Sequence, residues 1–243
     1  MNTSASDNNT YTSLCELAAS DDNVFETFKS SPNYTGILEH VNTEQGLQYF
    51  NEFKSNESIL SCLDKFKKND EFGSPNTSTY SFGEFSPTTL RYIKVLSDLS
   101  HHKLSEMDII EIGGGYGGQY TTLRQYAKPK SYTFIDLPQA LKLQKKYIEK
   151  VGLDDIEVNF YSSDDFPTLT GDLLLSNYAI SECTSEVQDG YIEKVINNCK
   201  KGYITHNGLW GYSHTEFADI LKHNVNVLEE IPLTYHHNVI LTW

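Results

Sequence analysis

The stretch DIIEIGGGYGG, residues 108–118, decides the fold. An apolar run interrupted only by Glu111 leads directly into five glycines that are separated only by Tyr116. Glycine adopts positive φ angles and lets the backbone approach a ligand closely. The pattern therefore predicts a buried strand over 109–112, a tight turn, and a helix over 119–127, which is how a Rossmann-like α/β sheet begins.

Strand and helix patterns alternate through the rest of the chain. Strands are predicted at 132–135, 156–161, 172–176 and 203–205, and helices at 138–151, at 186–199 and after the capping box of Ser213 and Glu216. The last two strands, 225–229 and 239–243, are separated by about nine residues, too few for a parallel crossover. The sequence thus predicts a mostly parallel α/β sheet with an antiparallel end and helices on both faces.

The first third of the chain has a different character. Ser86 and Pro87 suit the start of a helix, which opens a domain predicted to span 86–243. Residues 1–85 are predicted to form an N-terminal helical extension that acts as a lid. Within it we expect disorder over 1–12, about two to four short helices over 13–70 and a linker loop over 70–85. Tyr80, Phe82 and Phe85 are expected to help cover the acceptor pocket.

Composition limits the partners that this chain can have. It contains 33 Asp and Glu against 19 Lys and Arg, giving a net charge of −14 over 243 residues. Nucleic acids and anionic membranes are bound mainly through basic residues, so neither is expected as a partner, and a neutral or cationic small molecule fits better. The sequence shows no signal peptide and no apolar run of the roughly 20 residues that span a bilayer, which predicts a cytoplasmic location.

The four cysteines carry no recognisable pattern. Cys15, Cys62, Cys183 and Cys199 form no CxxC pair and no zinc spacing, so free thiols are expected. The sequence leaves open whether the chain forms a homo-oligomer.

The glycine turn raises the question of its ligand. Gly113, Gly115 and Gly118 satisfy GxGxxG, which is typical of dinucleotide binding, whereas the absence of GK[ST] excludes a Walker A loop. Glu111 stands two residues before the first glycine, where a carboxylate would repel a pyrophosphate and attract a cation. S-adenosylmethionine carries an ammonium and a sulfonium and no phosphate, so Glu111 favours this cofactor over a dinucleotide.

Two further positions fit a nucleoside. Asp136 ends the second strand, 23 residues after Gly113, where a carboxylate can accept hydrogen bonds from ribose hydroxyls. The alternative for Asp136 is an acid that stabilises the N-terminus of the following helix. After the third strand, Ser163 and Asp164 are candidates to meet the adenine amino group, although the neighbouring Asp165 leaves the choice of acid open.

Several ordered blocks resemble class I S-adenosylmethionine-dependent methyltransferases, and more narrowly a sugar O-methyltransferase family. The blocks are FGEFSPTTLRYIKVLSDL (82–99), DIIEIGGGYGGQY (108–120), YTFIDLPQALKLQKKYI (132–148), DLLLSNYAISE (172–182), GYITHNG (202–208) and EEIPLTYHHNVILTW (229–243). The resemblance covers residues 80–243. It implies a seven-stranded sheet with a reversed last strand and an enzyme that methylates a hydroxyl of a sugar, either nucleotide-linked or part of a glycan.

The resemblance also implies where the ligands bind. The cofactor is expected to contact Glu111, Gly113, Gly115, Gly117 and Asp136. The neighbouring positions Gly114, Tyr116, Leu137, Ser163, Asp164 and Asn177 are further candidates for cofactor contact. Asn177 and Glu182 are implied to lie beside the reacting centre. A dinucleotide-dependent sugar oxidoreductase or epimerase, and a methyltransferase-like binding module, remain as alternatives.

A hydroxyl acceptor needs a general base or a metal, because it is a poor nucleophile while protonated. Glu182 is the first candidate for the base and His206 the second, although His206 departs from the family pattern at its position. His236 and His237 begin the last strand, and neighbouring strand residues point to opposite faces, so only one of them, taken as His237, is expected to reach the site. A Mg²⁺ site using Glu182 and a histidine lacks a cluster of oxygen ligands, so no metal is predicted.

Side chains for the acceptor are expected near the same edge of the sheet. Tyr178, Trp210, Tyr212 and Tyr235 could pack against the C–H face of a sugar or simply against their own loops, and Asn207 could donate a hydrogen bond. The substrate residues predicted here are Tyr178, Asn207, Trp210 and Tyr212.

Overall fold

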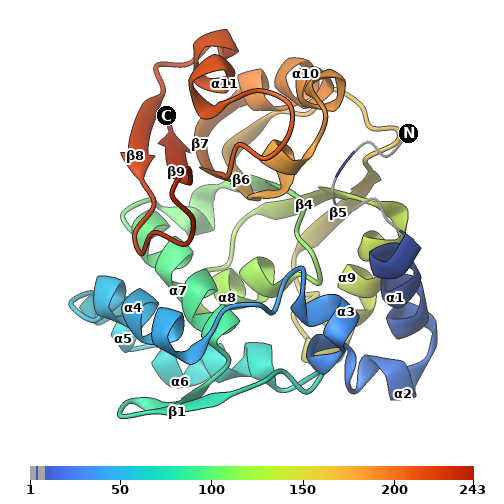
Figure 1. Cartoon of the computed structure of the whole chain (residues 1–243), viewed down its shortest axis with the longest axis vertical. Coiled ribbons are helices and arrows are strands. Elements are labelled where there is room, and N and C mark those ends of the chain that lie inside the picture. The colour runs from blue at the N-terminus through green and yellow to red at the C-terminus, as the bar shows by residue number, and fades with distance from the viewer. Residues whose placement is uncertain (1–3, 5–8) are drawn as a thin grey trace.

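A seven-stranded sheet forms the centre of the molecule (Figure 1), of which the computed structural model describes Ser4 and residues 9–243. The strand order is β5–β4–β3–β6–β7–β9–β8, with parallel pairing from β5 to β7 and with β9 antiparallel to both of its neighbours. The strands are β3 Asp108–Ile112, β4 Ser131–Asp136, β5 Glu157–Ser162, β6 Gly171–Asn177, β7 Cys199–His206, β8 Asn226–Glu229 and β9 Val239–Thr242. The predicted Rossmann-like sheet with a reversed last strand is confirmed.

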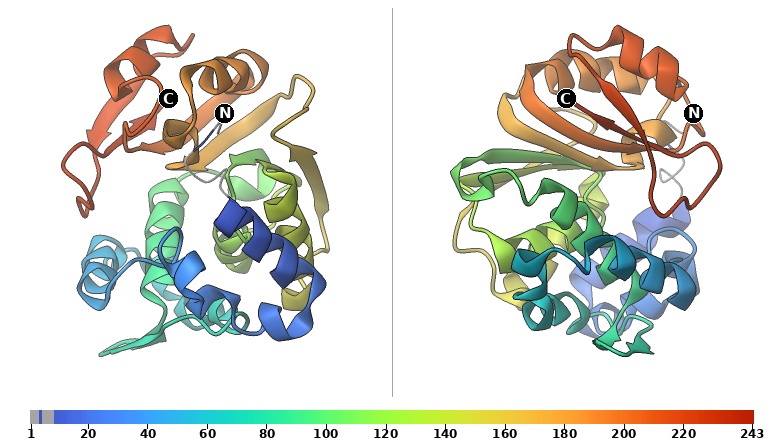
Figure 2. Two further views of the ribbon diagram at one scale, coloured as in Figure 1. Left: turned by 45° about the vertical axis from the view of Figure 1, so that its right-hand side comes forward. Right: turned by 90° about the vertical axis from the view of Figure 1, so that its left-hand side faces the viewer.

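Helices cover both faces of this sheet (Figure 2). On one face lie α7 Pro87–Leu99, α8 Gly118–Tyr126 and α9 Pro138–Val151, and on the other lie α10 Ser185–Lys194 and α11 His214–Ile220. Short 3₁₀ turns complete this part: η3 Leu104–Glu106, η4 Ala179–Glu182 and η5 Ile196–Asn198. The first face buries Leu96 and Phe134, and the second buries Ile192 and Phe217, so each face has its own apolar core.

The N-terminal extension adds a further layer on the α7–α9 side (Figure 2). It consists of α1 Asn9–Ser20, α2 Asp22–Phe25, η1 Phe28–Ser30, α3 Pro32–Thr35, α4 Thr43–Phe53, α5 Glu57–Leu60, α6 Leu63–Phe66, η2 Lys67–Asp70 and the hairpin β1 Ser78–Tyr80 with β2 Gly83–Phe85. Helix α1 packs against α9, and α4 packs against α7. A third apolar core, which includes Tyr34, Tyr116 and Tyr147, joins the extension to the glycine turn.

Local signals account for the elements that the sequence predicted well. Helix α9 spans the predicted residues because Pro138 occupies its first turn and Gly152 ends it with a φ of 73°. The helix expected over 186–199 is shorter, because α10 ends at Lys194 and Cys199 already begins β7. The extension contains more helical segments than expected.

Three expectations for the extension were wrong. Helix α1 begins at Asn9, so residues 9–12 are helical rather than disordered, while 1–3 and 5–8, to which the same prediction applied, lie outside the described residues. Residues 70–85 contain the β1–β2 hairpin instead of a plain loop. The aromatic residues of this hairpin pack inside the protein. Phe82 stacks on Phe50 of α4 with ring centroids 3.6 Å apart, and Phe85 is fully buried in the core. They therefore do not cover the cavity.

No helix in the described part of the chain is long and apolar enough to cross a membrane. All four cysteines are free thiols, as expected.

Candidate functional site

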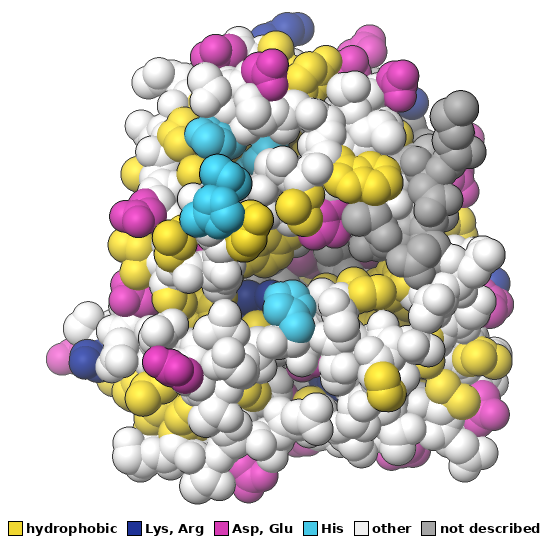
Figure 3. Space-filling view, viewed as in Figure 1, with side chains coloured by type: hydrophobic (Ala, Val, Ile, Leu, Met, Phe, Trp, Pro, Cys, Tyr) yellow, Lys and Arg dark blue, Asp and Glu magenta, His cyan; other side chains and the backbone are white. Residues whose placement is uncertain are grey.

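A cavity of about 960 Å³ lies beyond the carboxyl ends of the parallel strands. Its walls come from the residues that end or follow β3, β4, β5, β6 and β7, from the extension, and from the connection between β8 and β9. The hollow is visible in Figure 3, where a basic surface lies in it beside a histidine. Ligands of open α/β sheets bind at this edge, and the volume suffices for a nucleoside together with a second small molecule.

The glycine turn forms one wall of the cavity. Gly113, Gly114 and Gly115 line it, and Gly113 and Gly115 have φ angles of 74° and 61°, which L-residues with side chains rarely adopt. A Cβ on Gly113 would lie 2.0 Å from the Cβ of Ala179, and one on Gly115 would lie 2.8 Å from the Leu38 side chain. Both glycines are therefore required by conformation and by close packing.

Two of the predicted cofactor residues in this turn lie away from the cavity wall. Gly117 caps α8 with a φ of 92° and does not line the cavity. The Tyr116 side chain is 1% exposed and turns away from the cavity into the aromatic cluster of the extension. Tyr116 stands between Gly115 and Gly117, both of which have positive φ angles.

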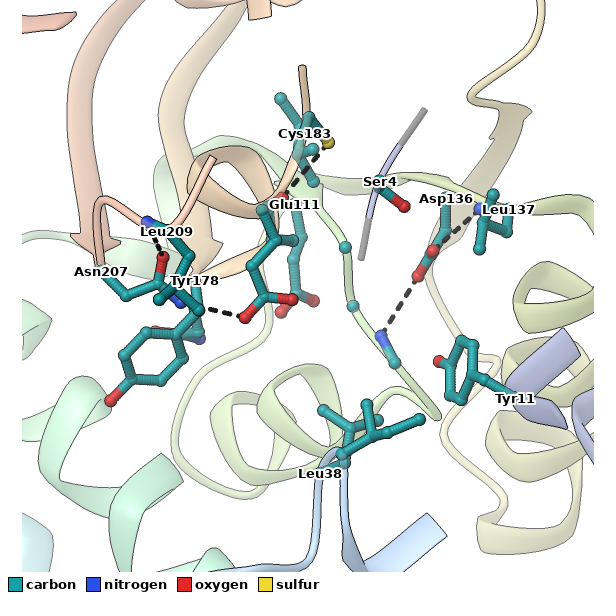
Figure 4. Close-up of a pocket in the computed structure, with 18 of the residues that line it drawn as sticks. Ser4, Tyr11, Leu38, Glu111, Asp136, Leu137, Tyr178, Cys183, Asn207 and Leu209 are labelled. Carbon is teal, nitrogen blue, oxygen red and sulfur yellow. Dashed lines mark hydrogen bonds between the residues drawn. The ribbon is translucent and has the colours of Figure 1, made fainter. Parts of the chain in front are cut away.

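Asp136 closes one end of the cavity (Figure 4). Its Oδ2 accepts hydrogen bonds from the backbone N–H of Gly115 at 3.1 Å and from Nε2 of Gln144 at 2.7 Å, and its Oδ1 accepts one from the N–H of Leu137 at 2.8 Å. Burial raises the pKa of Asp136 to about 6, and these donors oppose that rise. Asp136 is thus mostly ionised at neutral pH, and because a carboxylate has about four acceptor sites, it can take a further donor.

Glu111 occupies the middle of the cavity wall, between Asp136 and Tyr178 in Figure 4. Its side chain is 2% exposed, and its Oε2 accepts a hydrogen bond from the Tyr132 hydroxyl at 2.8 Å. Burial raises the pKa of Glu111 to about 8, against the lowering effect of Tyr132. A buried carboxyl of this kind ionises readily only when a positive charge is placed beside it.

The other predicted cofactor residues also line the cavity. Leu137, Ser163, Asp164 and Asn177 all contribute to its wall. Asp165 does not, because it pairs with Ser162 in an isolated β-bridge, so Asp164 is the acid that faces the cavity here.

Glu182 lies in the cavity wall on η4, and a buried polar network sets the orientation of its neighbour Asn207. Asn207 Oδ1 accepts hydrogen bonds from Ser181 Oγ at 2.8 Å and from the Leu209 N–H at 3.2 Å. These two donors leave Nδ2 of Asn207 to donate to Glu182 Oε1 at 3.0 Å. Glu182 therefore accepts a hydrogen bond from an amide whose orientation is fixed by Ser181 and the Leu209 N–H.

Tyr178 follows β6 with a φ of 68°, an unusual value for a tyrosine. Its hydroxyl donates to the carboxylate of Glu230, which also accepts from the N–H of Thr234 at 2.9 Å and from Nδ2 of Asn238 at 3.0 Å. Thr234 and Asn238 line the cavity, so this network fastens the β8–β9 connection over it.

Arg91 of α7 is a cavity residue that the sequence analysis missed. It is 6% exposed, and among the described residues that line the cavity it is the only Lys or Arg, whereas the acids there are Glu111, Asp136, Asp164 and Glu182. Its Nη2 donates to the Leu38 carbonyl at 3.2 Å, but its Nε has no partner among the described residues. No sequence motif marks Arg91, and only the resemblance block at 82–99 contains it.

The extension supplies further residues that the sequence analysis missed. The cavity wall includes Tyr11, Leu38, Gln45 and Tyr49, and Figure 4 shows Tyr11 and Leu38 facing the glycine turn. The sequence analysis anticipated a lid but gave no means of selecting these positions, because they share no motif and no common helix face.

Four predicted catalytic or substrate residues lie outside the cavity wall. His206 is fully buried on the opposite face of β7 against the Phe217 ring, at 5.2 Å between centroids, and burial lowers its pKa to about 4. His237 is exposed beside Tyr235. Trp210 donates its backbone N–H to Ser181 and is 39% exposed, and the Tyr212 hydroxyl donates to Asp189. Of the predicted acceptor residues, Tyr178 and Asn207 do line the cavity.

The described residues bring together no group of three or more His, Cys, Asp or Glu side chains that could hold a metal ion.

Comparison with known proteins gives similarity of fold only. No family model and no curated protein matches the chain. Solved structures with a similar fold include the mitomycin 7-O-methyltransferase MmcR (14% identity, TM-score 0.44) and the pyocyanin biosynthetic protein PhzM (11%, 0.45), each matched over 63% of this chain and 56% of its own length. A SAM-dependent methyltransferase from Aquifex aeolicus matches at 15% identity and TM-score 0.45, over 60% of this chain and 85% of its own.

The match thus spans little more than half the length of MmcR and of PhzM. Similarity of this extent identifies no reaction, substrate or partner for this chain.

Proposed function

We propose that this chain is an S-adenosylmethionine-dependent methyltransferase that methylates a hydroxyl of a sugar. The observation that carries the proposal is the distribution of charge in the cavity. Glu111 and Asp136 flank the glycine turn, and Arg91 is the one basic Lys or Arg side chain among the described lining residues. A ligand that combines positive charge, a diol and one carboxylate complements this set.

S-adenosylmethionine has these groups. The Asp136 carboxylate would accept from a ribose hydroxyl, Glu111 would face the positively charged part of the ligand, and the unpaired Nε of Arg91 makes its guanidinium a suitable partner for the amino-acid carboxylate. Glycines at 113–115 leave the backbone accessible along the wall between them. When bound, the cofactor supplies the activated methyl group.

A dinucleotide fits this cavity less well. Its pyrophosphate would lie at the glycine turn, where Glu111, Asp136 and Asp164 all contribute to the wall. Ionised carboxylates repel a pyrophosphate unless a proton or cation intervenes, which disfavours the oxidoreductase or epimerase alternative. The presence of Glu111, the glycines and Asp136 together also weighs against a methyltransferase-like fold that serves only as a binding module.

The chain's own residues then manage one proton. We assign Glu182 as the base that accepts the proton of the acceptor hydroxyl, since it is an acid in the cavity wall beside a fixed amide donor. Asn207 holds that carboxylate in place through Nδ2. The extension and the β8–β9 connection exclude water and orient the acceptor, which supplies a large part of the rate enhancement.

A sugar is the acceptor that best suits the remaining wall. Tyr49, Tyr178 and Tyr235 offer aromatic faces for the C–H face of a pyranose, and Gln45 and Asn238 offer amide groups to its hydroxyls. His206 is not assigned a role in this scheme, because it faces the opposite core.

Ligand binding tests the proposal directly. Calorimetry with S-adenosylhomocysteine should show binding to the wild-type chain, and Asp136→Ala should weaken that binding at least about tenfold through the loss of a charge-assisted hydrogen bond. The exposed Asp155, changed to Ala, serves as the control. Tight binding of NAD, with none of S-adenosylhomocysteine, would refute the proposal. A screen of free and nucleotide-linked sugars with labelled cofactor would then identify the acceptor.

A further inference from the structure

Lys29 is a buried lysine that the proposed reaction does not use. It belongs to η1 in the extension and is 0% exposed. Its Nζ lies 4.1 Å from the centroid of the Tyr116 ring and 4.6 Å from that of Tyr147. It also donates to the Asn69 carbonyl at 2.5 Å and to the Tyr147 hydroxyl at 2.9 Å. An ammonium enclosed in this way has exchanged its water for aromatic faces and two acceptors.

Tyr116 connects this lysine to the cofactor site. It stands between Gly115 and Gly117, whose φ angles of 61° and 92° leave the backbone on both sides intrinsically free to move. The Tyr116 side chain adds a restraint to the hydrogen bonds that Gly113, Gly115 and Gly117 make through their backbone. Its ring contacts Phe28 and Tyr147 edge-on, and its hydroxyl accepts from Nδ2 of Asn69 at 3.0 Å.

A movement of Tyr116 would displace its neighbour Gly115, which lines the cavity. The N–H of Gly115 donates to Asp136, and the Gly115 carbonyl accepts from Gln144 at 3.0 Å. A displaced turn would thus lose one of the donors that orient the Asp136 carboxylate. Lys29 stays charged at neutral pH, because burial lowers its pKa only to about 8 while Glu39 and Asp70 act in the opposite direction.

We infer that Lys29 is a positioning residue, through which the N-terminal extension fixes the glycine turn in the conformation that binds the cofactor. This inference rests on the proposed function, since the ligand concerned is the proposed S-adenosylmethionine. It also assigns the extension a part in donor binding in addition to covering the cavity. Preorganisation of this kind raises affinity because less ordering remains to be done on binding.

The inference predicts a loss of affinity in a variant that still folds. Lys29→Met removes one partner of a buried set of charges, because Glu39 and Asp70 act on Lys29, so it should unfold at a lower temperature than wild type. The Tyr147 hydroxyl still donates to the Asn69 carbonyl at 2.7 Å, so that carbonyl keeps a donor. Measured well below its unfolding temperature, Lys29→Met should bind S-adenosylhomocysteine about tenfold more weakly than wild type, because the turn is less restrained.

Lys145→Met provides the matched control. Lys145 also lies over an aromatic ring, with Nζ 4.9 Å from the Phe160 centroid, but it is exposed and does not contact the turn. Its replacement should leave the affinity unchanged. If Lys29→Met does not give a folded protein, Tyr116→Leu removes the other side of the same contact and should produce the same loss.

The outcomes separate the two proposals. Failure of the wild-type chain to bind S-adenosylhomocysteine would refute the proposed function. Wild-type binding together with an affinity within about twofold of it in Lys29→Met, or in Tyr116→Leu, would overturn the inference about Lys29 and leave the function standing.

Discussion

The substitution Glu111→Gln tests whether the cavity is built for a positively charged ligand. Burial raises the pKa of Glu111 to about 8, so the carboxyl of the ligand-free protein is mostly protonated at neutral pH. A cation bound beside it stabilises the ionised form and expels the proton. Binding of S-adenosylmethionine should therefore release protons, and Gln, which cannot titrate, should abolish Glu111's share.

The size of the effect follows from the pKa. At about pH 7, a group with a pKa of about 8 is protonated in roughly ten of eleven molecules, so ionisation on binding releases about 0.9 proton. At about pH 9 the same group is already ionised and releases only about 0.1 proton, and the affinity should be about tenfold higher than at about pH 7. Tyr132→Phe removes the hydrogen bond that favours the ionised form and should shift this dependence to higher pH.

Isothermal calorimetry in buffers with different ionisation enthalpies measures this release. The amino group of the ligand titrates too, but it does so equally in both variants, so the difference between wild type and Glu111→Gln isolates Glu111. A difference near zero at about pH 7 would show that Glu111 does not ionise on binding, and the charge argument for the cofactor would be withdrawn.

Two other residues give sharp tests. Glu182→Gln should lower turnover by about a hundredfold or more while the affinity for S-adenosylhomocysteine stays at the wild-type value, with the exposed Glu186→Gln as control; equal turnover in steady-state assays would remove Glu182 as the base. Burial lowers the pKa of His206 from 6.5 to about 4 in the folded chain. At pH values between these two, the unfolded chain therefore binds a proton at His206 and the folded chain does not. Stability should thus fall as pH drops through this window, by up to about 3 kcal/mol, and urea unfolding of His206→Leu should lack this part of the pH dependence; an unchanged profile would contradict a buried neutral imidazole.

The sheet could be predicted because its signals are local. Glycines mark the turn after β3, Pro138 and Gly152 delimit α9, and a short connection forces β9 to run antiparallel to β8. The acids at positions 111 and 136 were found for the same reason, since each stands at a fixed place relative to a strand end. Such features need no knowledge of what packs against them.

The rest of the site depends on contacts between distant segments. His206 ends a strand at the correct edge, but which face its side chain takes is decided by the register of β7, and it points to Phe217. Arg91 lines the cavity where it donates to the carbonyl of Leu38, 53 positions away in the chain. The groups that surround Lys29, namely Asn69, Tyr116 and Tyr147, come from three segments that share no sequence pattern. No periodicity or motif in the sequence encodes these meetings.

Two ionisable groups that are costly to bury lie beside the glycine turn. Glu111 is 2% and Lys29 is 0% exposed. Burial raises the pKa of Glu111 and lowers the pKa of Lys29, so in both cases it favours the uncharged form. Each is costly to bury, and its partners offset only part of that cost: Tyr132 for Glu111, and Glu39 and Asp70 for Lys29. Because the two lie at the same turn, one facing the cavity and the other bracing the turn from behind, stability alone does not explain them. Under the proposed function, a turn that must stay rigid beside a positively charged ligand accounts for both residues.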